Sequence, residues 1–276
     1  MGNATLTIFS ICIQASVGIV LFIAIAKLLN KEGIFKNATL VAAGLGIIGM
    51  LASVFHLGQP MKAFFALYQF SSSLLSREIW FTAIFVALVV LAALIFMLKP
   101  ENKGIITGLI VVAALVGLID IGLMGAIYSN ASVPFWQTSA TFVEFYMAAI
   151  SMGAILFLFL SLQEANFMKK ILAVTIAAAV AIQIAVVIPN LINLSISSSM
   201  AIQSSLVILS SMSLAGLFEW LFILAGAILA VWVAKDELSP SINNLVLSSA
   251  VLLLVGQTIG RYLFYAAMVV TGIGIS

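Results

Sequence analysis

Long apolar runs separated by short polar connections make up nearly the whole chain. An α-helix needs about 20 apolar residues to cross the hydrocarbon core of a bilayer, and the segments of a barrel would instead alternate apolar and polar residues. The pattern therefore predicts an all-α polytopic membrane protein, a bundle of eight transmembrane helices that forms a single integral membrane domain over residues 1–276. The expected spans are 5–29, 38–58, 78–98, 104–128, 139–163, 168–189, 211–234 and 242–271.

The composition agrees with this assignment. The chain is 64% hydrophobic and 7% charged, whereas about a quarter of the residues in a soluble domain are charged. The sequence has no basic patch that would bind nucleic acid. Between the expected spans we find no segment long enough for a water-soluble domain.

Basic residues fall unevenly on the two sides of the predicted bundle. The connections that follow the second, fourth and sixth spans, together with the two tails, hold only Lys62 and Arg77. The positive-inside rule places the more basic side in the cytoplasm, so we expect both termini and the linker from Pro60 to Arg77 to lie outside the cytoplasmic membrane. The other connections carry eight lysines: Lys27, Lys31, Lys36, Lys99, Lys103, Lys169, Lys170 and Lys235.

One outer stretch, Asn190 to Ser211, is rich in serine but also contains Leu, Ile and Met. Two interpretations fit this composition. The stretch is either an amphipathic segment on the membrane surface or an extension of the two spans that flank it.

Apart from the basic residues counted with the connections, six ionisable residues lie within or at the ends of the spans, where such residues are costly and mark functional sites by default. All six fall in the outer half of the membrane in the predicted topology, so the inner half offers no groups for a proton path across it. The six residues are His56, Glu78, Asp120, Glu144, Glu219 and Arg261.

Structural interpretations compete with functional ones at these positions. Glu78 follows Ser76, which would cap the third span, and an acid in the first turn suits the helix dipole. Arg261 would serve as a counter-ion to Asp120, Glu144 or Glu219. His56 at a helix end would be an interfacial residue.

The last span carries two patterns. Gly256 and Gly260 have the four-residue spacing that lets membrane helices pack closely, and Gln257, Arg261 and Tyr265 recur every four residues as a polar and aromatic stripe. Most Trp and Tyr residues fall on the outer side as well. This excess suggests that the outer face binds something flat or docks a partner protein.

The single histidine and the single cysteine limit the chemistry of this protein by itself. A b-type haem with two axial imidazoles needs two histidines, and one cysteine, Cys12, gives no intramolecular disulfide. We expect no haem and no metal in this chain.

Four motifs, in order along the sequence, resemble the membrane anchor subunit of the dimethyl sulfoxide reductase family. The first runs from His56 to Pro60 with Ala63-Phe64, and the second is Leu75-Ser76 with Glu78-Ile79. The others are Val133-Pro134 with Trp136, and Ile259-Gly260-Arg261 with Phe264-Tyr265.

The resemblance implies a three-part enzyme. An iron–sulfur subunit and a catalytic subunit with molybdenum on a pterin guanine dinucleotide would be the partners, and this chain would oxidise menaquinol at the outer leaflet. His56 and Glu78 match the family positions tied to quinol oxidation and are the expected catalytic residues. The expected quinol-binding residues are His56, Gly58, Pro60, Glu78, Trp136, Gln257, Arg261 and Tyr265.

Residue chemistry is consistent with that function. A quinol gives up two electrons and two protons, and an imidazole and a carboxylate suit the protons. The alternatives are a quinone-reactive subunit of a polysulfide or tetrathionate type of complex, a small-molecule or ion transporter, and a non-catalytic membrane tether. Transporters usually place their polar sites near the membrane midplane, and a tether would not need these ionisable residues.

Overall fold

The computed structural model describes residues 2–30, 33–55, 67–235 and 240–270, and the regular structure in these ranges is helical. Eight of the described helices are long and apolar enough to cross a membrane. This confirms the predicted all-α polytopic membrane protein. Helices suit such sequences because each backbone polar group in a bilayer must be paired within its own segment.

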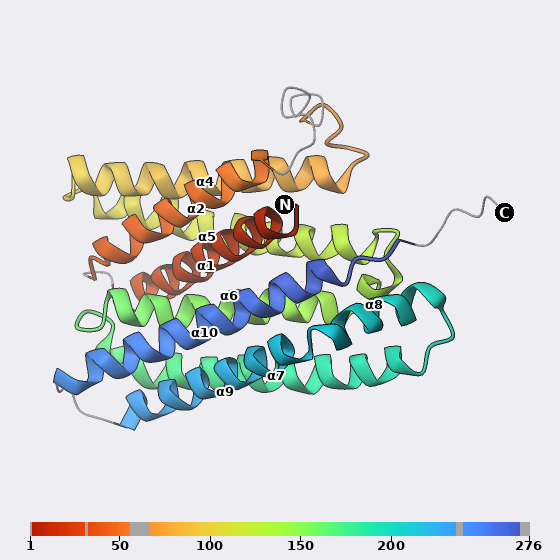
Figure 1. Ribbon diagram of the computed structural model, residues 1–276. Helices are drawn as coiled ribbons and strands as arrows, with labels where there is room; N and C mark the ends of the chain where they lie inside the picture. The colour runs from red at the N-terminus through yellow and green to blue at the C-terminus, as the bar shows by residue number, and fades with distance from the viewer. Residues whose placement is uncertain (1, 31–32, 56–66, 236–239, 271–276) are drawn as a thin grey trace.

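The long helices are labelled as in Figure 1, which also shows α8 (Met200–Ser211) and the connections between helices. Two short 3-10 turns, η2 (Pro134–Trp136) and η3 (Asn166–Met168), precede α6 and α7. The eight long helices are α1 (Gly2–Leu29), α2 (Lys36–Phe55), α4 (Leu74–Leu98), α5 (Lys103–Ser129), α6 (Ala140–Leu160), α7 (Lys169–Ser195), α9 (Ser213–Lys235) and α10 (Pro240–Ala266).

The long helices form two groups of four. Helices α1, α2, α4 and α5 contact one another in a closed ring, and helices α6, α7, α9 and α10 form a second ring beside the first. The rings are joined where α1 contacts α6 and α10, and where α5 contacts α6. A four-plus-four arrangement therefore exists in the packing, although the sequence shows no convincing repeat.

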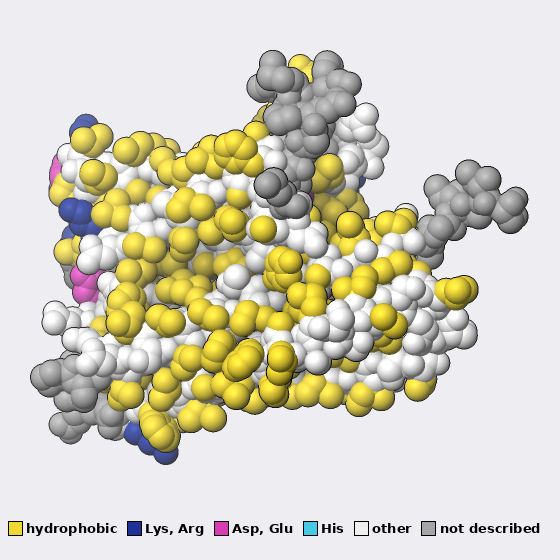
Figure 2. Space-filling model, viewed as in Figure 1, with side chains coloured by type: hydrophobic (Ala, Val, Ile, Leu, Met, Phe, Trp, Pro, Cys, Tyr) yellow, Lys and Arg dark blue, Asp and Glu magenta, His cyan; other side chains and the backbone are white. Residues whose placement is uncertain are grey.

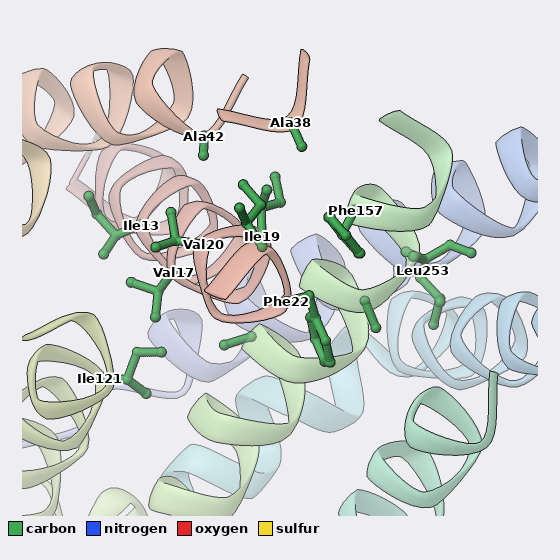
Figure 3. Packing of buried hydrophobic residues seen from close by; sticks show 14 of the residues in the cluster. Ile13, Val17, Ile19, Val20, Phe22, Ala38, Ala42, Ile121, Phe157 and Leu253 are labelled. Atoms are coloured by element: carbon green, nitrogen blue, oxygen red, sulfur yellow. The ribbon is translucent and has the colours of Figure 1, made fainter. Parts of the chain in front are cut away.

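Helix α1 lies at the centre of the molecule. Its most apolar window is 72% buried, against 22% for α9. Figure 3 shows side chains of α1, among them Val17 and Val20, between Ala42 of α2 and Ile121 of α5. A helix that is apolar on all sides is one that is buried on all sides.

The two ends of the bundle differ in charge. The α1–α2, α4–α5, α6–α7 and α9–α10 connections share one end, and Figure 2 shows Lys and Arg side chains gathered there. We call this the lysine-rich end. An even number of helices brings Gly2 and Ala266 to the other end, which we call the opposite end. That the opposite end faces outside the cytoplasmic membrane stays a prediction.

The stretch from Asn190 to Ser211 is an extension of the helices at the opposite end. Helix α7 continues past Pro189 to Ser195, and α8 leads into α9 with a break at Met212. In Figure 1, α8 runs on in roughly the direction of α9. This arrangement favours the interpretation as an extension of the flanking spans.

Candidate functional site

The candidate site lies towards the opposite end of the bundle, between α1, α4, α5, α6 and α10. Three of its predicted residues, His56, Gly58 and Pro60, lie outside the described residues. The structure shows that α2 ends at Phe55, at the opposite end. His56 therefore follows a helix that leads towards the same end as the rest of the site.

Glu78 lies in the second turn of α4 and is 6% exposed. The N-cap of α4 is Ser73, whose side chain accepts a hydrogen bond from the Ser76 backbone N–H at 3.3 Å. The predicted cap at Ser76 is therefore wrong, and Glu78 lies about 6 Å, or four residues, inside the helix. A carboxyl group at this depth does not serve as a first-turn acid.

The Glu78 carboxyl group belongs to an electrostatic cluster that spans three helices. It interacts with Asp120 and Tyr128 of α5 and with Tyr265 of α10. Asp120 is fully buried, and the Thr82 hydroxyl lies 2.9 and 3.1 Å from its two oxygens. Thr82 is one turn from Glu78 on α4, so the hydrogen-bonded Asp120 and Glu78 lie in the same corner of the bundle.

Arg261 is buried near the place where the two four-helix rings meet, and its side chain is 5% exposed. Its Nη2 donates to Oε1 of Gln14 on α1 at 3.3 Å, and the guanidinium carbon lies 3.6 Å from the centre of the Phe145 ring on α6. A cation over an aromatic face is stabilised by the ring quadrupole. Among the described residues, Nε and Nη1 of Arg261 have no acceptor.

The counter-ion hypothesis for Arg261 holds only at longer range. Glu144 of α6 and Glu219 of α9 interact with its charge, but within the described part of the protein its hydrogen bond is to Gln14. Asp120, the third candidate, is bonded to Thr82 instead. Arg261 is therefore a buried cation with much of its donor capacity unused.

An aromatic cluster covers Arg261 on the side of the opposite end. Trp136 stacks on Phe264 with ring centres 5.0 Å apart and donates its indole N–H to the Phe264 carbonyl at 2.9 Å. Tyr128 lies 5.2 Å from Trp136 and 5.4 Å from Tyr265, measured between ring centres. The Tyr265 hydroxyl lies near those of Ser10 and Tyr128, without a hydrogen bond of regular geometry to either.

The predicted stripe of Gln257, Arg261 and Tyr265 is buried along its whole length. Gln257 is the member of the stripe nearest the lysine-rich end. Its amide nitrogen donates to Gln183 of α7 at 2.9 Å and to Ser151 of α6 at 3.4 Å. Gln257 thus connects α10 to two neighbouring helices. It lies about one turn deeper than Arg261.

The glycines beside this stripe pack against α9. A Cβ at Gly256 would lie 3.0 Å from the Glu219 carbonyl oxygen and 2.7 Å from the Ile223 side chain, and a Cβ at Gly260 would meet the Glu219 carboxyl group. The close packing predicted from their spacing is therefore present.

Sequence reasoning did not identify Gln14, Ser10 and Phe145 as parts of this site. A glutamine in the middle of the apolar first run was the available signal, since it must find a partner in the membrane. Across the described residues, no group of three or more His, Cys, Asp or Glu side chains is arranged to hold a metal ion.

Comparisons with known proteins agree with the motifs. The family model described as DMSO reductase anchor subunit (DmsC) matches residues 1–267. The C subunit of anaerobic dimethyl sulfoxide reductase from Escherichia coli (strain K12) is 28% identical over 283 residues, which cover 98% of this sequence and 95% of that protein.

Two shorter matches point the same way. The C subunit of anaerobic dimethyl sulfoxide reductase from Haemophilus influenzae is 33% identical over 155 residues, 54% of each protein. The YnfH subunit of anaerobic dimethyl sulfoxide reductase from Escherichia coli (strain K12) is 28% identical over 231 residues, with 83% of this sequence and 80% of that protein covered.

Proposed function

The chain belongs to the family of DMSO reductase anchor subunits, and from this premise we propose that it oxidises a quinol, menaquinol by resemblance, near the opposite end of the bundle. Its electrons would pass to an iron–sulfur subunit and then to a molybdopterin catalytic subunit. The observation that carries the proposal is the convergence of Glu78 of α4 with Arg261 and Tyr265 of α10 on one buried, aromatic-lined region.

The proposed pocket has an acid side and a donor side. Glu78 lies on the acid side with Asp120, Arg261 lies on the donor side, and Tyr128 and Tyr265 interact with both Glu78 and Arg261. We place the quinol ring between the two sides, with Trp136 in the aromatic wall and Gln257 at the floor. By resemblance, His56, Gly58 and Pro60 would complete the acid side.

The chemistry needs proton acceptors on this protein and an electron acceptor beyond it. Each quinol that is oxidised releases two protons and two electrons. Glu78 and His56 are the proposed proton acceptors, because a carboxylate and an imidazole are common general bases near neutral pH. The electrons would go to an iron–sulfur cluster of the partner subunit.

A partner has a surface to bind at the opposite end. Among the described residues, the connections at this end expose large apolar side chains, including Tyr68 (83%), Ile196 (81%) and Met200 (86%). A hollow of 370 Å³ adjoins Met200 at the α7–α8 turn and is also lined by Gln203 and Val207. Exposed apolar surface of this kind is typical of protein interfaces, so we propose that the iron–sulfur subunit docks here, on the outer face of the cytoplasmic membrane.

Two electron donors test the function on the assembled complex. A reduced short-chain naphthoquinol must use this subunit, whereas a reduced artificial dye delivers electrons to the clusters directly. In His56→Ala and Glu78→Gln, naphthoquinol oxidation should fall by roughly a hundredfold or more, the usual contribution of a general base. Dye-driven turnover should stay at the parental level.

Ser249→Ala is the matched control. Ser249 is a buried polar residue of α10 towards the lysine-rich end, where its hydroxyl donates to the Gly226 carbonyl at 2.7 Å. This variant should keep both activities. If naphthoquinol oxidation in both His56→Ala and Glu78→Gln equals that of the parent, the proposed acid side is wrong.

A further inference from the structure

Four buried donors near the centre of the bundle make no hydrogen bond of regular geometry to the described residues. They are Nε and Nη1 of Arg261, Nε2 of Gln14 and the hydroxyl of Tyr265. Gln14 is 0% exposed, Tyr265 is 1% exposed and Arg261 is 5% exposed. The three side chains adjoin one another, since Gln14 accepts a hydrogen bond from Arg261, and Tyr265 is one turn from Arg261 on α10.

Such a cluster is unusual for a protein interior. The large majority of buried polar groups have a hydrogen-bond partner, and an unsatisfied buried donor destabilises the folded protein, more so if it is charged. Four of them at one place point to an acceptor that binds there and is not part of this protein.

The surroundings limit what that acceptor is. The Phe145 ring covers one face of the guanidinium group, so new hydrogen bonds must come to its edge, in its plane. Tyr128 and Phe264 add aromatic walls close to Tyr265, with ring centres 5.4 Å from it. A flat ring that carries an oxygen in its own plane fits these constraints.

We propose that Arg261, Gln14 and Tyr265 form a donor subsite that binds one carbonyl oxygen of the quinone, the oxygen that points away from Glu78. This rests on the proposed quinol function and deepens it. Arg261 and the Gln14 amide nitrogen donate hydrogen bonds and do not take up a proton at this position. The subsite therefore holds a carbonyl or oxide oxygen, and the two oxygens of the ring have different environments.

Infrared spectroscopy of the bound ring separates the two oxygens. The probe is a short-chain naphthoquinone carrying ¹³C at one carbonyl or at the other, bound to the assembled complex. Hydrogen bonds lower a carbonyl stretching frequency, so the carbonyl in the donor subsite should give the lower band in the parent. In Gln14→Met and Tyr265→Phe this band should move towards the free-carbonyl frequency while the second band stays in place.

Binding affinity should follow the same pattern. Each of these two substitutions removes one neutral donor, and a loss of about 1 kcal/mol corresponds to naphthoquinone binding that is roughly fivefold weaker. Arg261→Gln removes a charged donor and should weaken binding by more than tenfold. If Arg261→Gln does not assemble, the other two variants still decide the question.

Ser16→Ala is the control on α1. Ser16 is buried two residues beyond Gln14, and its hydroxyl is already bonded to the Ala42 carbonyl at 2.7 Å. In the Ser16→Ala complex, the carbonyl bands and the affinity of bound naphthoquinone should equal those in the parent. Unchanged bands in Gln14→Met and Tyr265→Phe, in a complex that still oxidises naphthoquinol, would overturn the subsite and leave the proposed function standing. If the parent complex binds no naphthoquinone, both proposals fail.

Discussion

Gly18 of α1 and Gly153 of α6 touch backbone to backbone where the two four-helix rings meet. A Cβ at Gly18 would lie 2.7 Å from the Cα of Gly153, and a Cβ at Gly153 would meet the backbone of Gly18. Backbone atoms cannot turn aside as a flexible side chain can. The two rings therefore depend on the absence of a side chain at both positions.

Gly153→Ala should separate α1 from α6 and destabilise the subunit by about 1–3 kcal/mol, the usual cost of overpacking. Thermal unfolding of the purified complex measures the effect. Gly44→Ala on α2 and Gly108→Ala on α5 are matched controls, because a Cβ at either position meets nothing within 4 Å. These controls should be neutral or slightly stabilising, since alanine favours helix. An equal effect in all three variants would contradict the contact.

The contrast between two glycine pairs shows what the sequence could predict. Gly256 and Gly260 lie on one helix, so their four-residue spacing was visible and their close packing was predicted. Gly18 and Gly153 are 135 positions apart, and only the packing of α1 on α6 brings them together. The eight helices followed from local apolar runs, whereas the arrangement in two rings depends on such distant pairs.

The same limit applies to the candidate site. Glu78 and Arg261 stood out because ionisable residues are rare within spans. Their partners did not, since Gln14 and Phe145 meet Arg261 only through tertiary packing. The sequence also places Lys27 in a connection, yet it is buried in the last turn of α1, where its Nζ donates to the Gly33 carbonyl at 3.0 Å.

Thr82→Val should destabilise the subunit by about 1–3 kcal/mol, because it removes the hydroxyl that is bonded to the buried Asp120 carboxyl group. Valine has nearly the shape of threonine, so the loss reports the hydrogen bond and not a cavity. Thr258→Val is the control, since Thr258 is exposed and its hydroxyl bonds only within its own helix. Thermal unfolding of Thr82→Val and Thr258→Val measures the difference. If the two variants unfold at the same midpoint temperature, the Thr82–Asp120 hydrogen bond does not stabilise the subunit.

Reporter fusions test the orientation of the bundle. A periplasmic reporter should be active when fused after Asn130 or at the C-terminus and inactive when fused after Lys99. A cytoplasmic reporter should give the reverse pattern. The reason is the lysine excess at the end that holds the α4–α5 connection. The same activity at Lys99 and Asn130 would refute the topology.

Crosslinking tests where the iron–sulfur subunit docks. A photo-crosslinking side chain at Met200 or Ile196 should capture the partner, because these apolar side chains are exposed at the opposite end. The same probe at Lys103 or Lys170, at the lysine-rich end, should not. Capture from the lysine-rich positions alone would place the partner on the other face.

The last prediction concerns Arg261 and Glu219, whose charges interact without a direct hydrogen bond. Arg261→Ala should destabilise the subunit by about 2–4 kcal/mol, since it removes the contact with Phe145 and leaves nearby acids without a counter-charge. The effect of Glu219→Gln should then differ between two backgrounds. In the parent it removes an attraction and should destabilise, whereas in Arg261→Ala the buried acid takes up a proton, so Glu219→Gln should be close to neutral.

A double-mutant cycle measures this coupling directly. Thermal unfolding of the parent, Arg261→Ala, Glu219→Gln and the double variant gives the four free energies that the cycle needs. Glu219→Gln with the same effect in both backgrounds would mean that Arg261 does not compensate a charge on Glu219. Arg261 would then be held by contacts such as those with Phe145 and Gln14, without a contribution from Glu219, and its unused donors would remain for a bound oxygen.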